Sequence, residues 1–154
     1  MNMVLMEIKN VNSRDLRKIL NLEKKIFKED AFSKKLIENL FRQNTLFLKL
    51  EYGKIRKVLV GFIIVIRDRE DRANIINLVI HPRFQNKGYG SHLLHKTIER
   101  IKRLEEVKKI ILNVQVNNFI AIKLYEKFNF RKNFKIIKNY YQSGEDAYLM
   151  ELNT

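Results

Sequence analysis

A turn that contains two glycines is the first place where this sequence could do chemistry. In HPRFQNKGYGSHLL (residues 81–94), Gly88 and Gly90 separate an apolar run from a pattern that predicts a helix. Amides in the first turn of a helix lack intrahelical acceptors, and glycine lets a ligand approach the backbone closely. Arg83 and Lys87 add positive charge, so the turn favours a phosphate or pyrophosphate. The alternative is that Gly88 only adopts a left-handed conformation and Gly90 only permits close packing.

Two polar residues further along the chain share one face of a predicted helix. Asn118 and Tyr125 are seven positions apart, so both side chains can point at one ligand. The alternatives are a helix cap for Asn118 and a buried aromatic for Tyr125.

Other kinds of catalytic chemistry find little support. The chain has no cysteine, which excludes thiol nucleophiles and thiolate metal sites. His92 and His95 have no third ligand that would complete a metal signature, so no metal is expected. Ser91 has no neighbouring base and is interpreted as part of the phosphate turn.

The charge of the chain bears on its partners. Lys plus Arg number 31 against 17 Asp plus Glu, a formal charge of +14, which favours polyanionic partners or an anionic cofactor. Acids are interspersed among the bases, so no specific nucleic acid is predicted, and a solvated Lys-rich surface is the alternative. The length predicts one domain over residues 1–154. No apolar run approaches the length of a membrane span, and the first residues lack the pattern of a secretory signal, so a cytoplasmic location is expected.

These residues must be positioned by a mixture of strands and helices. Periodicity predicts strands at 3–8, 45–52, 58–68, 73–80, 108–116, 130–141 and 146–152. Helices are predicted after Asn12 or Ser13, after Ser33, after the glycine turn and after Asn117 or Asn118. The order predicts an α/β fold with a mixed, mostly antiparallel sheet.

Three segments resemble one known family. Gln85–Gly90 is similar to the acetyl-CoA motif of the GNAT N-acetyltransferases, and NVQVNNFIAIKLYEKFNF resembles a later segment of that family. NYYQSGEDAYLMEL resembles the C-terminal end of RimI-like and NatA-catalytic-subunit-like protein N-terminal acetyltransferases. The resemblance covers residues 73–153. It implies a GNAT fold, whose seven-stranded sheet is flanked by about four helices.

The resemblance also implies a cofactor site and a reaction. Acetyl-CoA is the implied acetyl donor, without a metal, and the amine attacks the thioester directly without an acyl-enzyme. Asn118 is implied to bind the CoA arm, and Tyr125 to protonate or hydrogen-bond the departing thiolate. The implied cofactor-binding residues are Leu78, Val79, Ile80, Gln85, Asn86, Lys87, Gly88, Tyr89, Gly90, Ser91 and Asn118.

The sequence departs from the family at the general base. RimI-like enzymes carry Glu at the position that matches Asn113, and an amide cannot take a proton, so Asn113 is expected only to position a water. Glu29, in the connection KEDAFS, is the leading substitute, and its alternative is a solvated loop carboxylate. Tyr140 and Tyr141 are further candidates for a proton relay.

The absence of a carboxylate at position 113 also bears on the substrate. An α-amine, with a pKa of about 8, needs less help from a base than a lysine at about 10.4, so the missing carboxylate favours α-amines. Phe32, Tyr140 and Tyr141 are expected to bind the acceptor. The predicted partners are protein or peptide N-termini, with ribosome association as an option and no membrane. The alternatives are acetylation of a small amine or a lysine side chain, and a non-catalytic basic module that binds ribosome or RNA.

Overall fold

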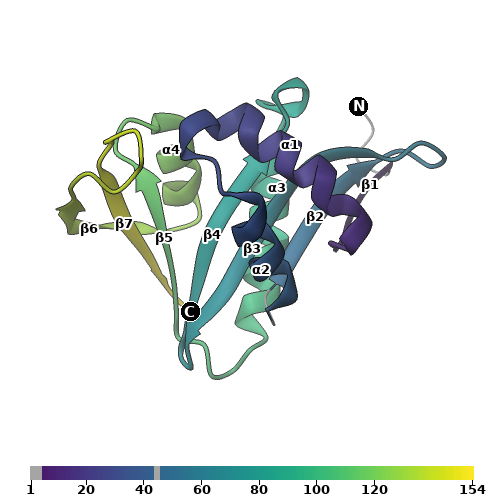
Figure 1. Ribbon diagram of the computed structural model, residues 1–154. Coiled ribbons are helices and arrows are strands. Elements are labelled where there is room, and N and C mark those ends of the chain that lie inside the picture. The colour runs from purple at the N-terminus through teal and green to yellow at the C-terminus, as the bar shows by residue number, and fades with distance from the viewer. Residues whose placement is uncertain (1–4, 44–45) are drawn as a thin grey trace.

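The computed structural model describes residues 5–43 and 46–154, whose strands form one seven-stranded sheet in the order β1-β2-β3-β4-β5-β7-β6 (Figure 1). The strands are β1 (Met6–Asn10), β2 (Leu46–Tyr52), β3 (Val58–Arg69), β4 (Arg72–Ile80), β5 (Lys109–Gln115), β6 (Arg131–Ile137) and β7 (Ala147–Asn153). The helices are α1 (Leu16–Phe27), α2 (Lys34–Arg42), α3 (Tyr89–Lys102) and α4 (Phe119–Lys127). Short 3-10 turns are η2 (Ser13–Asp15), η3 (Lys28–Asp30) and η4 (Pro82–Phe84).

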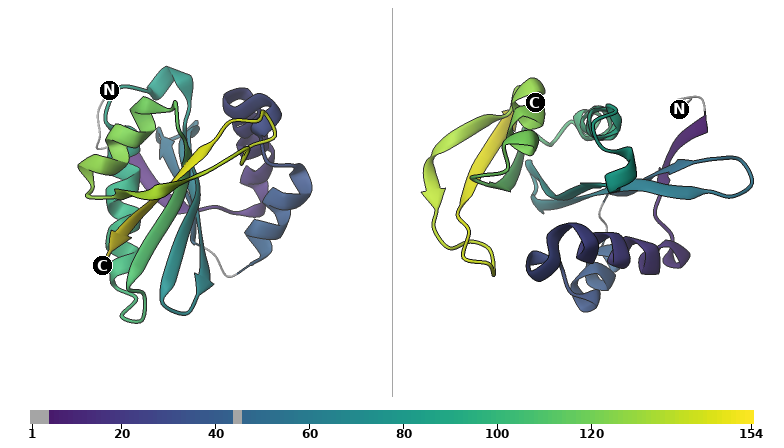
Figure 2. Two further views of the ribbon diagram at one scale, coloured as in Figure 1. Left: turned by 90° about the vertical axis from the view of Figure 1, so that its left-hand side faces the viewer. Right: turned by 90° about the horizontal axis from the view of Figure 1, so that it is seen from above.

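Helices cover both faces of the sheet. Figure 2 shows α1 and α2 on one face and α3 and α4 on the other. Each face has its own apolar core: Ile19, Ile37 and Phe62 belong to the first, and Leu93, Ile110 and Phe130 to the second. Burial of these side chains holds the sheet and helices together.

Polar contacts at its start fix helix α1. Asn12 and Asp15 form a capping box at η2, the 3-10 turn that leads into α1: the Asn12 N–H donates to the Asp15 carboxylate, and the Asn12 side chain accepts from the Arg14 N–H. Lys49, 5% exposed in β2, lies 3.0 Å from both Asp15 and Glu51. A buried cation flanked by two carboxylates is compensated, so this contact anchors α1 to the sheet.

The sheet opens between its two central strands. The parallel ladder of β4 and β5 runs only from Arg72 opposite Lys109 to Ile75 opposite Leu112. Both strands continue beyond these pairs, β4 to Ile80 and β5 to Gln115. The edge of β4 that faces β5 is therefore without a partner strand after Ile75, which leaves room for a ligand between the strands.

The predicted fold class, with its seven strands, four helices and their order, is confirmed. The boundaries of β6 were wrong, because the strand ends at Ile137 and Tyr140 and Tyr141 lie in the following loop. Asn139 adopts φ 51°, and its N–H donates to the Asp146 carboxylate, which turns the chain out of the sheet. The first predicted strand begins at Met6, and residues 3 and 4 of that prediction lie outside the described residues. No helix in the described ranges is long and apolar enough to cross a membrane.

Candidate active site

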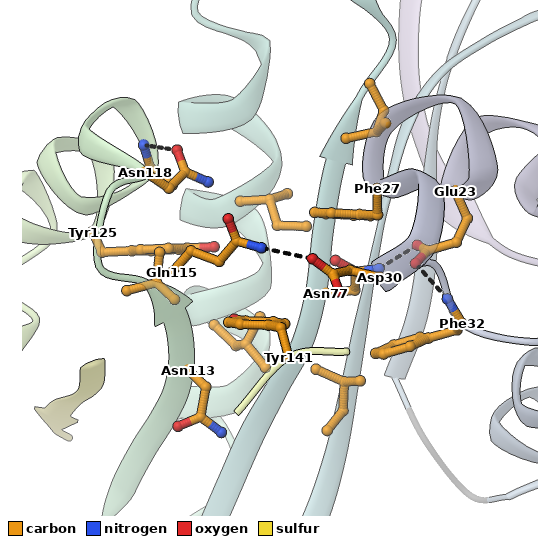
Figure 3. A pocket seen from close by; sticks show the side chains of 16 residues that line it. Glu23, Phe27, Asp30, Phe32, Asn77, Asn113, Gln115, Asn118, Tyr125 and Tyr141 are labelled. Atoms are coloured by element: carbon orange, nitrogen blue, oxygen red, sulfur yellow. Dashed lines mark hydrogen bonds between the residues drawn. The ribbon is translucent and has the colours of Figure 1, made fainter. Parts of the chain in front are cut away.

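A cavity of about 350 Å³ lies where β4 and β5 separate (Figure 3). Its lining comes from α1, η3, both strands, α4 and the loop before β7. The lining residues are Glu23, Ile26, Phe27, Asp30, Phe32, Ile75, Ile76, Asn77, Leu78, Asn113, Val114, Gln115, Asn118, Ala121, Tyr125 and Tyr141. Tyr125 and Asn118, which the sequence placed on one face, both line this cavity.

Tyr125 enters the cavity from α4. Asn118 caps this helix by accepting a hydrogen bond from the Ala121 N–H at 3.2 Å. The Tyr125 ring packs edge-on against Phe130 at 5.8 Å between centroids and is 8% exposed, while its hydroxyl points into the cavity (Figure 3). Burial raises the pKa of this phenol well above its ordinary value, so it keeps its proton at neutral pH.

A buried carboxylate that was not predicted from the sequence lies on the other side of the cavity. Glu23 of α1 is 1% exposed and accepts hydrogen bonds from the Phe32 N–H at 3.0 Å and from the Asn77 side-chain amide. Burial raises the pKa of Glu23 to about 7, and the two hydrogen bonds oppose part of that rise. A carboxyl group that titrates near neutral pH can accept a proton from an amine.

Glu23 had a signal in the sequence. It stands four residues after Ile19, on the apolar face of a helix whose buried residues are Ile19, Leu20 and Leu22. A carboxylate at such a position is either paired or functional. Glu29, the predicted base, is exposed and lines no cavity described here, so the geometry favours Glu23 instead.

Asn113 lies on β5 at the boundary of the cavity. Its Nδ2 donates to the Tyr140 hydroxyl at 3.0 Å, while its buried Oδ1 has no hydrogen-bond partner among the described residues. A buried amide oxygen without a donor is costly, and an incoming N–H group or water would satisfy it. The role of Asn113 in positioning a water stays a prediction.

The predicted acceptor residues surround a second cavity of about 690 Å³. Phe32 and Tyr141 line both cavities, and Tyr140 lines only the second. The Tyr140 and Tyr141 rings meet edge-on at 4.9 Å between centroids, and burial raises the pKa of Tyr141. Tyr141 therefore lies where the two cavities adjoin, with Tyr140 beside it, and we call the first cavity the inner one and the second the outer one.

The glycine turn forms the start of α3. Gly88 is the N-cap, with φ +85°, and a Cβ there would meet no atom within 4 Å. The first bond of the helix runs from His92 N–H to Gly88 C=O, so the amides of residues 89–91 precede the hydrogen-bonded ladder. Lys127, which the sequence analysis did not name, brings its Nζ to 3.5 Å from Ser91 Oγ. Free amides, open space and cations fit an anionic cofactor.

The other predicted cofactor residues differ in their burial and contacts. The side chains of Val79 and Tyr89 are buried in the cores, so only their backbones are available to a ligand. Gln85 is exposed and donates to Ile80 C=O at 2.9 Å, which ties the turn to the end of β4. Asn86 and Lys87 are exposed. Leu78 lines the inner cavity. A Cβ added at Gly90 would lie 3.6 Å from side-chain atoms of Ile80 and Leu124, which is an ordinary van der Waals contact.

No cluster of three or more potential metal ligands occurs in residues 5–43 and 46–154. His95 instead lies 2.9 Å from Glu99, one turn along the same exposed helix face.

The chain belongs to the acetyltransferase (GNAT) family, whose sequence model matches residues 13–130. It is 39% identical over 79 residues to an N-alpha-acetyltransferase of Sulfolobus acidocaldarius, a match that covers 51% of this chain and 46% of that protein. The chain thus aligns with about half the length of this curated relative.

Two further comparisons span most of the chain. A putative [ribosomal protein bS18]-alanine N-acetyltransferase of Bacillus subtilis is 29% identical over 148 residues, which cover 93% of this chain and 92% of that protein. The crystal structure of the ribosomal-protein-S18-alanine N-acetyltransferase from Escherichia coli superposes with a TM-score of 0.82 at 27% identity. That match covers 96% of this chain and 93% of the other.

Proposed function

We propose that the protein transfers an acetyl group from acetyl-CoA to the N-terminal α-amine of proteins or nascent peptides. The observation that carries this proposal is the pairing of two groups across one cavity: Tyr125 holds a proton, and Glu23 titrates near neutral pH (Figure 3). Relatives named N-alpha-acetyltransferase and [ribosomal protein bS18]-alanine N-acetyltransferase support the choice of acceptor.

The residues of the chain fit acetyl-CoA as the donor. The amides at the start of α3 and nearby Lys87 and Lys127 would hold its pyrophosphate. The unpaired edge of β4 at residues 76–80, together with Asn118, would hold its extended arm. When bound, acetyl-CoA supplies an acetyl group already activated as a thioester.

Each catalytic group has one task in this proposal. Glu23 accepts a proton from the acceptor ammonium, directly or through a water, and delivers a neutral amine. Tyr125 donates a hydrogen bond where negative charge would develop on a leaving thiolate. Asn113 Oδ1 accepts a hydrogen bond from the acceptor backbone or from a water.

The electrostatic character of the cavities supports an amine acceptor. In a chain of charge +14, the described residues that line either cavity include the carboxylates Glu23 and Asp30 but no Lys, Arg or His. A cationic amine is therefore attracted to this site, while the cofactor end stays basic. Ribosome association and a cytoplasmic location remain part of the proposal.

Mass spectrometry tests the acceptor. The protein is incubated with acetyl-CoA and a peptide with a free N-terminus, or with the same peptide blocked at its N-terminus and carrying an internal lysine. We expect acetylation of the free N-terminus to predominate. Predominant modification of the internal lysine would overturn the proposal.

The two tyrosines at the cavities give a second test. Tyr140→Ala and Tyr141→Ala should each raise the KM for the peptide without abolishing CoA binding.

A further inference from the structure

One carboxylate joins parts of the chain that are far apart in sequence. Asp30 Oδ1 accepts the Ser143 N–H at 2.9 Å, and Oδ2 accepts the Ser143 hydroxyl at 2.8 Å. Oδ2 also accepts Gln115 Nε2 at 3.0 Å (Figure 3). Three donors thus converge on Asp30 from β5 and from the loop at residues 138–146, which we call the strap.

The strap is held on two sides. On the β5 side, Asn113 donates to Tyr140 at 3.0 Å, and Asn117 donates weakly to Glu145 at 3.4 Å. On the α1–α2 side, Asp30 is the one described residue whose hydrogen bonds reach the strap. Figure 2 shows the strap extending from β6 and β7 toward the end of α1. Loss of the Asp30 bonds would therefore free one side of the strap while the other side stays attached.

The strap crosses the boundary between the two cavities. Asp30, Phe32, Asn113 and Tyr141 line both the inner cavity of about 350 Å³ and the outer cavity of about 690 Å³. An extended chain end could place its amine in the inner cavity and its next residues in the outer one. A lysine within a longer chain would have to bring flanking residues on both sides under the strap.

We propose that Asp30 is a positioning residue that determines the preference for chain ends, because its bonds to Ser143 keep the strap closed over the acceptor path. This inference rests on the proposed function, since it concerns how that same acceptor is selected. It assigns Asp30 no contact with the reacting atoms.

Asp30→Asn is the central test, because it keeps the shape of the side chain but leaves one oxygen for three donors. Steady-state kinetics are measured with the free N-terminal peptide and with the blocked lysine peptide. We expect Asp30→Asn to raise the KM for the free peptide about tenfold, a typical cost for losing charge-assisted hydrogen bonds. We expect kcat to stay within about threefold of wild type, and the preference for the free N-terminus to fall about tenfold.

Two further variants separate this role from general damage. Ser143→Ala, at an exposed position, keeps the backbone bond to Asp30 and should raise KM about threefold, without further loss when combined with Asp30→Asn. Glu145→Gln makes the same chemical change in the strap, but on the β5 side, and should leave KM and the preference unchanged. Calorimetry should give wild-type CoA affinity for all three variants.

The outcomes distinguish this inference from the proposed function. If wild type prefers the free N-terminus but Asp30→Asn has unchanged KM and unchanged preference, the inference alone is wrong. The same conclusion follows if Glu145→Gln loses as much as Asp30→Asn, or if kcat falls while KM does not. If wild type prefers the internal lysine, the proposed function is wrong and the inference is overturned with it.

Discussion

The cofactor side and the acceptor side that we propose for this site are built in different ways. The cofactor side uses consecutive residues, in which a strand end, a left-handed Gly88 and the first turn of α3 follow one another in sequence. The acceptor side uses contacts over long separations: Glu23 with Asn77, 54 residues apart, and Asp30 with Ser143, 113 apart. The first depends on local backbone geometry, whereas the second exists only after the sheet and helices have assembled.

Tyr125 lies between these two regions, and its loss should have the largest effect. We expect Tyr125→Phe to lower kcat about a hundredfold or more, the range seen when a donor to developing charge is removed. The ring packs against Phe130 and should keep doing so, so CoA affinity should change little. Steady-state rates and calorimetry check both points, and a variant with the wild-type rate would show that the hydroxyl has no catalytic task.

The acceptor side is tested next by Glu23→Gln. We expect kcat to fall about a hundredfold, a typical contribution of a general base. Because the pKa of Glu23 is about 7, the wild-type rate should rise with pH through that value as the carboxylate forms. The variant should retain only the rise that reflects the acceptor amine, with a pKa of about 8. Glu29→Gln, at an exposed residue, is the matched control and should behave as wild type.

Burial of Glu23 should also make the free energy of unfolding depend on pH. The pKa of Glu23 rises from 4.5 to about 7 on folding, so the folded state binds the proton more tightly. Its stabilising contribution is complete below pH 4.5 and is lost as pH rises to about 7. Between pH 5 and pH 8, wild type should lose about 2 kcal/mol more unfolding free energy than Glu23→Gln. Urea denaturation at both pH values measures this, and parallel losses would contradict the burial of a titrating carboxyl.

The cofactor side is tested by charge at Gly88. Gly88→Glu and Gly88→Gln impose the same strain at φ +85°, and both side chains enter open space, so they differ only in charge. We expect the Glu variant to bind CoA about tenfold more weakly than the Gln variant, with the difference reduced at high salt. Equal affinities in two folded variants would place the pyrophosphate elsewhere.

The smallest effect concerns the first residue of the acceptor. Glu23 and Asp30 line the cavities, and no described lining residue is a cation, so an acidic first side chain would find no partner. We expect a peptide that begins with Asp to have a kcat/KM about fivefold below that of the same peptide beginning with Asn. An advantage for the Asp peptide would show that the acceptor side is less acidic than its lining indicates.

The sequence by itself determined the order and type of the elements and the glycine turn that we propose as the cofactor side. Periodic apolar residues, the caps Asn12, Ser33 and Asn118, and the glycine turn all act over a few residues, so their geometry follows from local backbone and burial preferences. The seven-residue spacing of Asn118 and Tyr125 placed both on one side of a helix, which repeats every 3.6 residues, and both line the inner cavity.

Only the tertiary structure decided which carboxylates lie at the cavities. Local sequence favoured Glu29, but that side chain is exposed on η3, whereas Glu23 of α1 and Asp30 of η3 line the cavity. The pKa of Glu23 depends on desolvation by elements that meet from distant parts of the chain, as does the bond from Asp30 to Ser143. Such properties depend on burial and on long-range contacts, and neither is encoded within a single segment.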